Sequence, residues 1–205
     1  MPSLYEKYVL PKVIHCVCGL KPMMRQRDKV VPQASGTVLE LGIGSGLNLS
    51  YYDDKQVSHL IGIDPTPDMG QLTKRIDRST LSVEFIKCGA EDLPIDDHQI
   101  DTVVATYTFC TIPDIFSAFA EVRRVLKPTG KLLFVEHGLA PDVPIQKKQH
   151  RINPIWRRIA GGCHLNRDIP HLMKLGGFKI DHVEEMYLPG WKPATFNVWG
   201  SAHLY

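Results

Sequence analysis

The feature that most constrains the fold of this chain is a glycine-rich turn behind a short apolar run. Residues 37–41, TVLEL, have the character of a buried strand, and glycine then occupies every second position, at Gly42, Gly44 and Gly46. Glycine loses more backbone entropy on folding than other residues, so three in one turn indicate positive φ angles or a backbone that approaches a ligand closely. A strand followed by such a loop, and then by an expected helix, predicts a ligand-binding α/β domain.

Beyond this loop, short apolar runs alternate with segments of helical periodicity. Phe116, Phe119, Val122 and Val125 recur at three-residue spacings, which predicts a helix that stops at residues 127–130, Lys-Pro-Thr-Gly. Strands and helices in alternation indicate βαβ units and a parallel sheet. Five strands are expected here, at residues 37–41, 59–63, 83–86, 102–106 and 131–136.

The part of the chain beyond residue 165 follows a different pattern. A helix is expected over 169–175, where a Gly-Gly pair follows it, and strand-like character returns over 178–187. A Pro-Gly turn at 189–190 and alternating residues over 195–205 come next. This order predicts an antiparallel hairpin that closes the sheet.

Bulk properties limit the class of protein. A length of 205 residues suits one domain, and a formal net charge of +2 is too small to indicate nucleic-acid binding by itself. Five scattered cysteines are typical of a reducing cytoplasm and not of a disulfide-stapled secreted domain. We expect no secretory signal peptide in residues 1–8 and no membrane span, because no run of about 18 apolar residues occurs.

The glycine spacing discriminates between cofactors. A dinucleotide fold needs G-x-G-x-x-G, but Leu47 and Leu49 stand where either register would place its last glycine, which tells against NAD or FAD. A P-loop is excluded because no Gly-Lys-Ser/Thr follows. The G-x-G-x-G loop preceded by Glu40 resembles motif I of class I S-adenosylmethionine-dependent methyltransferases, and the resemblance extends from about Thr37 to Tyr205.

The resemblance implies a complete fold and a cofactor. The implied fold is α/β, with a Rossmann-like seven-stranded, mostly parallel sheet, helices on both faces and a C-terminal antiparallel β-hairpin. It implies a methyltransferase domain over 36–205 behind an N-terminal helical cap over 1–35. The implied cofactor is S-adenosylmethionine, with S-adenosylhomocysteine as product. Its methionyl end would face Glu40 and the backbone of Gly42, Gly44 and Gly46.

Further cofactor residues are expected at the ends of later strands. Asp64 lies about 20 residues beyond the loop, where this fold places a carboxylate that binds both ribose hydroxyls. The alternative is that Asp64-Pro65 only begins a helix-capping turn. The run from Cys88 to Pro94 resembles the adenine-contacting loop, although Gly89 replaces the usual aspartate. The predicted cofactor residues in these segments are Asp64, Pro65, Ala90, Glu91, Thr106 and Tyr107.

Methyl transfer from a sulfonium mainly requires alignment of donor and acceptor in a water-poor pocket, so a catalytic base is optional. His137 ends the fifth strand and is the first candidate base; Glu136 would orient it or line the pocket. His164 is the second candidate. The alternative for each histidine is a hydrogen-bonded structural role. No metal is expected, since the spacing of Cys163, His164 and His171 matches no metal signature.

Several alternatives stay open at the level of sequence. The apolar and basic stretch over 9–29 predicts either a helical cap packed on the sheet or a peripheral membrane contact. Segments 134–138 and 162–167 resemble small thiol methyltransferases, while the core also resembles quinone and lipid-amine methyltransferases. The expected acceptor is therefore a small or lipid-like thiol, quinone-type ring or lipid amine, and not nucleic acid. The rival classes are a noncatalytic S-adenosylmethionine-binding protein and a nicotinamide oxidoreductase.

Overall fold

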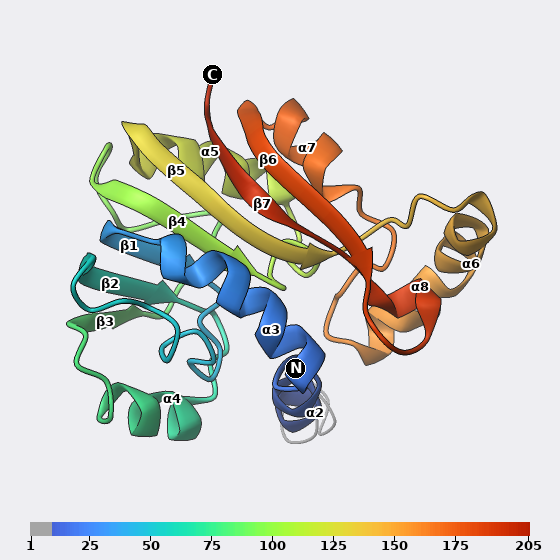
Figure 1. Cartoon of the computed structure of the whole chain (residues 1–205), viewed down its shortest axis with the longest axis horizontal. Helices are drawn as coiled ribbons and strands as arrows, with labels where there is room; N and C mark the ends of the chain where they lie inside the picture. The colour runs from blue at the N-terminus through green and yellow to red at the C-terminus, as the bar shows by residue number, and fades with distance from the viewer. Residues whose placement is uncertain (1–9) are drawn as a thin grey trace.

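A seven-stranded sheet forms the centre of the protein, whose computed structural model describes residues 10–205 (Figure 1). The strand order is β3-β2-β1-β4-β5-β7-β6, with five parallel strands and with β7 antiparallel to both of its neighbours. In chain order the elements are α2 (Leu10–Cys18), α3 (Lys21–Val30), η1 (Val31–Gln33), β1 (Gly36–Leu41), β2 (Val57–Ile63), α4 (Met69–Ile76), β3 (Val83–Ile86), β4 (Ile100–Thr106), α5 (Ile115–Val125), β5 (Leu126–His137), α6 (Val143–Ile159), α7 (Ile169–Leu175), β6 (Phe178–Tyr187), α8 (Lys192–Thr195) and β7 (Phe196–Leu204).

Both faces of the sheet are covered, because neighbouring residues of each central strand point to opposite sides. On β1, Val38 packs in a cluster with Val30 of α3, whereas Leu39 packs in a second cluster with residues of α5 and α7. Figure 1 shows α3 crossing one face of the sheet, with α5 and α7 behind it. Strands buried on both faces explain the continuous apolar runs in the sequence.

The topology fixes where a ligand can bind. β1 pairs with β2 on one side and with β4 on the other, so the chain reverses its direction of winding between β1 and β4. In open α/β sheets, ligands bind beyond the carboxyl ends of the strands at such a switch point. The glycine turn follows β1 at this position.

The fold predicted from the sequence is confirmed, including the closing hairpin of β6 and β7. Helix α7 has the predicted bounds, and α5 begins where Asp114 accepts hydrogen bonds from the backbone N–H groups of Phe116 and Ser117. Pairing of β5 with β4 is interrupted over 127–130, where the stop was expected, and regular pairing resumes at Lys131. Short α8 was not predicted.

One expectation about the glycine loop is wrong. Residues 44–51 form successive turns and not a helix. Their backbone bonds link residues three positions apart, as in Gly46 N–H to Ile43 and Tyr51 N–H to Asn48. The buried Asn48 uses its side chain in hydrogen bonds to distant residues, and glycine and asparagine are weak helix formers, so the turns replace the helix.

The N-terminal segment forms helices over its described part. α2 and α3 are joined by a short turn, and α3 contacts β5 and β7. The expectations for residues 1–9, including the start of the predicted membrane-contact stretch, lie outside the described residues. Between residues 10 and 205, no helix combines the length and apolar character needed to cross a bilayer.

Candidate active site

The three glycines of the turn after β1 have positive φ angles, of 68° at Gly42, 55° at Gly44 and 74° at Gly46. A Cβ on Gly42 would lie 2.6 Å from Thr108 Oγ1, and one on Gly46 would lie 2.9 Å from a Leu49 methyl carbon. A Cβ on Gly44 would meet no atom of the described chain closer than 3.8 Å. Packing therefore requires two of the glycines, whereas the space over Gly44 suits a bound molecule.

Glu40 lies beneath this turn and is 2% exposed. Its Oε1 accepts a hydrogen bond from Asn48 Nδ2 over 3.0 Å, and its Oε2 accepts one from the Tyr52 hydroxyl over 2.8 Å. Burial raises the pKa of Glu40 to about 7, although the hydrogen bonds that it accepts oppose the shift. A nearby cation would favour the ionised carboxylate.

Asp64 follows β2 and reaches back to the glycine turn. Its Oδ2 accepts a hydrogen bond from Gly44 N–H over 3.0 Å, and its Oδ1 accepts one from Thr66 N–H over 2.7 Å. Burial raises the pKa of its carboxyl group. The alternative role of helix cap falls to Asp68, which accepts from Gln71 N–H at the start of α4. Asp64 instead holds the segment after β2 against the glycine turn after β1.

The predicted adenine-contacting loop follows β3. Ala90 is 6% exposed, and Glu91 accepts a hydrogen bond from Asp114 N–H over 3.4 Å. A Cβ on Gly89 would lie 2.7 Å from Glu91 Oε2, so the carboxylate folds back over the position where the family usually has aspartate. Pro65, by contrast, is exposed.

Arg27 of α3 is a residue of this region that the sequence did not single out. It is 5% exposed, and its Nη1 donates to Asn48 Oδ1 over 2.8 Å and also to Thr106 Oγ1. Its guanidinium lies 5.1 Å from the centre of the Tyr107 ring. The basic residues Arg25 and Lys29 of the same helix are exposed, and only the docking of α3 distinguishes Arg27 from them.

Thr106 ends β4, Tyr107 follows it, and their side chains contact the glycine turn and β7, respectively. Thr106 Oγ1 accepts from Asn48 Nδ2 over 3.0 Å. Tyr107 has a φ of 57°, uncommon for a residue with a side chain, and its hydroxyl donates to Asn197 Oδ1 on β7 over 2.8 Å. Strained backbone of this kind is concentrated at functional sites.

Glu136 holds the loop after β4 in place. It is completely buried, and its Oε1 accepts from Thr108 N–H over 2.6 Å and from Phe109 N–H over 2.8 Å. Burial raises the pKa of Glu136 to about 7. Its Oε2 has no hydrogen-bond partner within the described residues. The carboxylate thus positions the segment that carries Cys110.

His137, Cys110 and Cys163 come together at this edge of the sheet, and their ligand atoms all lie within 4.8 Å of one another. His137 Nε2 is 3.0 Å from Cys163 Sγ, which also accepts from Trp156 Nε1 over 3.2 Å. The hydrogen bond between the two cysteines lowers the pKa of Cys163 and raises the pKa of Cys110. Burial disfavours protonation of His137, but the neighbouring Cys163 favours it, and the pKa of His137 is raised.

The sequence did not indicate this cluster, which we call the Cys110–His137–Cys163 cluster. Its members follow β4, end β5 and follow α6, so only the folded chain joins them. His164 lies outside it, and burial, with Arg167 and Arg157, lowers its pKa to about 4. His171 is exposed on α7. The groups that lie beside Cys163 are thus Cys110 and His137, and not the His164 and His171 that the sequence analysis considered with it.

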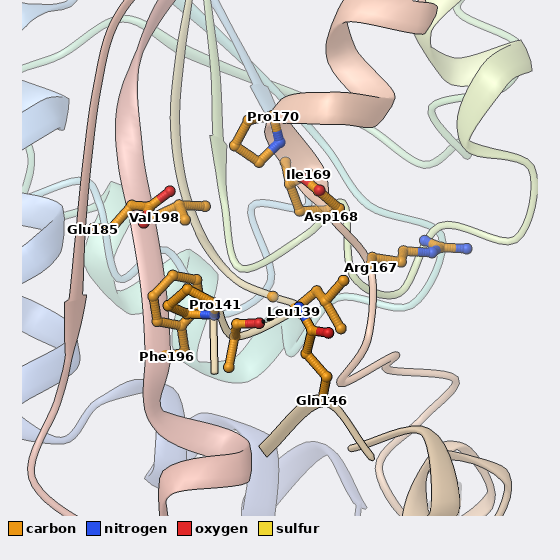
Figure 2. Close-up of a pocket in the computed structure, with 12 residues that line it drawn as sticks. Leu139, Pro141, Gln146, Arg167, Asp168, Ile169, Pro170, Glu185, Phe196 and Val198 are labelled. Carbon is orange, nitrogen blue, oxygen red and sulfur yellow. Dashed lines mark hydrogen bonds between the residues drawn. The ribbon is translucent and has the colours of Figure 1, made fainter. Parts of the chain in front are cut away.

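A cavity of about 190 Å³ begins one residue after His137 (Figure 2). It is lined by the loop over 138–141, by residues 167–170 and by side chains of β6 and β7. None of its lining residues belongs to the glycine turn. The Arg167 side chain points away from it in Figure 2. Its guanidinium donates a hydrogen bond to the Phe109 carbonyl. This cavity is therefore separate from the space over Gly44.

A sheet of this order, with a glycine turn after β1 and a carboxylate after β2, defines the fold class of the class I methyltransferases. Residues 39–134 match the methyltransferase domain family. The fold also resembles the crystal structure of a SAM-dependent methyltransferase from Methanosarcina mazei, with a TM-score of 0.64, 23% identity and coverage of 84% of this chain and 93% of that one.

Curated relatives give a closer match. The chain is 31% identical over 177 residues to thiol S-methyltransferase TMT1B of Homo sapiens, covering 82% of this chain and 72% of that protein. It is 32% identical over 165 residues to the Rattus norvegicus TMT1B, covering 78% of this chain and only 64% of that protein. It is 30% identical over 129 residues to the ubiquinone/menaquinone biosynthesis C-methyltransferase UbiE of Citrifermentans bemidjiense, covering 58% and 52%. The chain belongs to the S-adenosylmethionine-dependent methyltransferases, and S-adenosylmethionine is its cofactor.

Proposed function

We propose that this enzyme methylates the sulfur of a small, largely apolar thiol. The observation that carries the proposal is the position of the Cys110–His137–Cys163 cluster at the carboxyl ends of β4 and β5, beside the strand ends that form the glycine turn. Thr106 contacts Asn48 of the glycine turn, and Cys110 follows it by four residues. The cofactor space and the cluster thus adjoin the same short loop.

The cofactor residues would act through charge and shape. Asp64 would accept hydrogen bonds from the ribose hydroxyls, and the open side of Gly44 would receive the methionyl part. Glu40 would face the ammonium group, and Arg27 would face the carboxylate. The remaining surface of the cofactor site would be lined by Ala90, Glu91, Thr106 and Tyr107, with Pro65 at its edge. When bound, S-adenosylmethionine supplies a methyl group activated by its sulfonium sulfur.

The chain's own contribution is then alignment and exclusion of water. Arg27 and Tyr107 cover the inner end of the cofactor space, and Trp156 closes the cluster beside Cys163. A thiol acceptor must lose its proton before or during transfer, and His137 stays the predicted group for accepting it. Glu136 would act indirectly, by holding residues 108 and 109. A catalytic role for His164 stays a prediction.

The curated relatives favour a thiol over a quinone-type ring or a lipid amine as the acceptor. Relatives named thiol S-methyltransferases align over 78% and 82% of this chain, whereas the quinone relative aligns over 58%. Membrane contact through residues 9–29 and the domain boundary at residue 35 stay predictions.

The test is a product assay with the full chain. The protein is incubated with S-adenosylmethionine and, separately, with an alkyl thiol, an aryl thiol, a reduced quinone or phosphatidylethanolamine vesicles, and products are identified by mass spectrometry. We expect methyl thioethers from the thiols, with turnover reduced at least tenfold in Asp64→Asn and unchanged in Asp96→Asn, an exposed control. Methylation of only the quinol or the lipid would overturn the proposed acceptor.

A further inference from the structure

Two thiols and an imidazole meet in the Cys110–His137–Cys163 cluster, and their geometry suits a metal ion. The ligand atoms lie within 4.8 Å of one another, and the shortest separation, His137 Nε2 to Cys163 Sγ, is 3.0 Å. Tetrahedral Zn²⁺ with bonds of about 2.0 to 2.3 Å requires ligand atoms about 3.6 to 3.8 Å apart. The ligand atoms would therefore move by about 1 Å or less relative to one another, apart for the closest pair and together for the most distant one, to surround an ion.

The backbone that carries the three ligands is tied together independently of any ion. His164 N–H donates to the Cys110 carbonyl over 2.8 Å, which joins the segment after α6 to the loop after β4. Arg167 donates to the Phe109 carbonyl, and Glu136 accepts from Phe109 N–H. Hydrogen bonds therefore hold the backbone segments of the three side chains in fixed positions relative to one another.

Metal sites are usually supported by groups that orient their ligands. Trp156 Nε1 donates to Cys163 Sγ over 3.2 Å, and such N–H to sulfur bonds stabilise a thiolate. Cys110 is 2% exposed and Cys163 is 9% exposed, so water has little access to either sulfur. Two cysteines and one histidine are a ligand set that zinc enzymes use when the fourth position stays open for water or substrate.

We propose that Cys110, His137 and Cys163 bind one Zn²⁺ ion and that the open fourth position takes the sulfur of the acceptor. The second half of this statement rests on the proposed thiol methyltransferase function. As a metal ligand, His137 does not act as the base, so the acceptor enters as the thiolate R–S⁻ after losing its proton to bulk water, and it binds through sulfur. Its sulfur electron pair then forms the new S–CH₃ bond, while the methyl–sulfonium bond breaks and its electron pair leaves with S-adenosylhomocysteine. The neutral thioether is a weaker ligand and dissociates.

The first test uses cobalt as a spectroscopic probe. Metal-free, reduced full-length protein is titrated with Co²⁺ under exclusion of oxygen. We expect thiolate-to-cobalt charge-transfer absorption and tetrahedral cobalt bands that saturate at one equivalent and disappear when Zn²⁺ is added. Absence of these bands would overturn the metal site. A Cys110–Cys163 disulfide that forms under these conditions in preference to metal binding would also overturn it.

Variants assign the bands to the cluster. Cys110→Ser, His137→Gln and Cys163→Ser should each lose them, whereas Cys88→Ser, a cysteine after β3, should keep them. Trp156→Phe retains all three ligands but removes the N–H donor to Cys163, and we expect metal affinity to fall about tenfold. Bands that persist at full strength in folded Cys110→Ser and Cys163→Ser would overturn the proposal.

A final measurement separates this proposal from the proposed function. A thiol added to the cobalt protein without S-adenosylmethionine should shift the cobalt bands, and removal of metal should reduce thiol methylation at least tenfold. Full turnover in the metal-free protein would overturn the metal's part, leave the thiol acceptor intact and favour His137 as a base. Intact cobalt bands with no thiol methylated would overturn the proposed acceptor and leave the metal site.

Discussion

Arg27 Nη1 on helix α3 donates a 2.8 Å hydrogen bond to Asn48 Oδ1 in the glycine turn. Asn48 in turn donates to Glu40 and Thr106, so one buried network joins the N-terminal helix to the ends of β1 and β4. In the proposed cofactor site, this buried guanidinium would supply the positive charge for the carboxylate of the cofactor's methionyl group. We therefore expect helix α3 to contribute to cofactor binding.

We expect Arg27→Met to weaken S-adenosylmethionine binding about tenfold or more, because hydrogen bonds to charged groups contribute about 1.5 to 3 kcal/mol. Calorimetric titration of the variant measures the loss. Arg25→Met, on the exposed side of the same helix, is the matched control and should bind like the wild type. Equal affinity in both variants would remove Arg27 from the cofactor site.

Glu40 should make the stability of the ligand-free protein depend on pH. Its pKa is about 7 in the folded chain and near 4.5 when unfolded, so the folded state binds more protons between these values. The stability that the protonated Glu40 contributes is complete below pH 4.5 and is lost as the pH rises to about 7. The free energy of unfolding should therefore fall by about 3 kcal/mol over this range, at 1.36 kcal/mol per pKa unit. Urea unfolding across this range measures it.

Glu40→Gln supplies the comparison for this pH dependence. The variant keeps an acceptor oxygen for only one of the donors Asn48 and Tyr52, and it does not titrate. Its free energy of unfolding should be lower throughout but should fall less between pH 4.5 and 7 than that of the wild type. Identical slopes in the two proteins would contradict the raised pKa. Saturating S-adenosylmethionine should also flatten the wild-type slope, since its ammonium group favours the ionised carboxylate.

Gly42 and Gly44 should respond differently to alanine. Gly42→Ala places a methyl group 2.6 Å from Thr108 Oγ1, so we expect clear destabilisation. Gly44→Ala meets no close protein atom and adds only the left-handed backbone strain of about 1 to 2 kcal/mol, yet it should reduce cofactor affinity at least tenfold. Thermal unfolding and calorimetric titration separate the two effects. Wild-type affinity in folded Gly44→Ala would contradict the assigned cofactor space.

The sequence predicted the helices, strands and turns that depend on a local pattern of residues. Apolar runs and caps, such as Asp114 before α5, determine individual elements, and the glycine turn indicated the cofactor. It did not predict the turns over 44–51, because Asn48 takes its hydrogen-bond partners from β1 and β4. Long-range side-chain bonds of this kind leave no periodic signal.

The same limit applies to the site. His137 lies at the end of β5, as expected from the sequence, and its role as a base stays a prediction. Cys110 and Cys163 are 53 positions apart, so no short-range pattern indicated that they lie beside His137. Arg27 is one of several basic residues of α3, and only packing of that helix on the sheet buries it. Positions at strand ends could thus be predicted, while partners brought together by docking could not.

Tyr107→Phe tests how the C-terminal hairpin supports the site. The change removes the hydroxyl that donates to Asn197 Oδ1, and Asn197 is completely buried, so its oxygen is left without that donor. We expect a loss of about 1 to 3 kcal/mol in the free energy of unfolding, the usual cost of an unsatisfied buried acceptor. Tyr51→Phe, at a half-buried tyrosine of the glycine turn, should cost less. Because the ring that faces Arg27 is retained, S-adenosylmethionine affinity should change less than threefold. Urea unfolding and calorimetry check both quantities, and a stability equal to that of the wild type would show that the hydroxyl does not anchor β7 to the loop after β4.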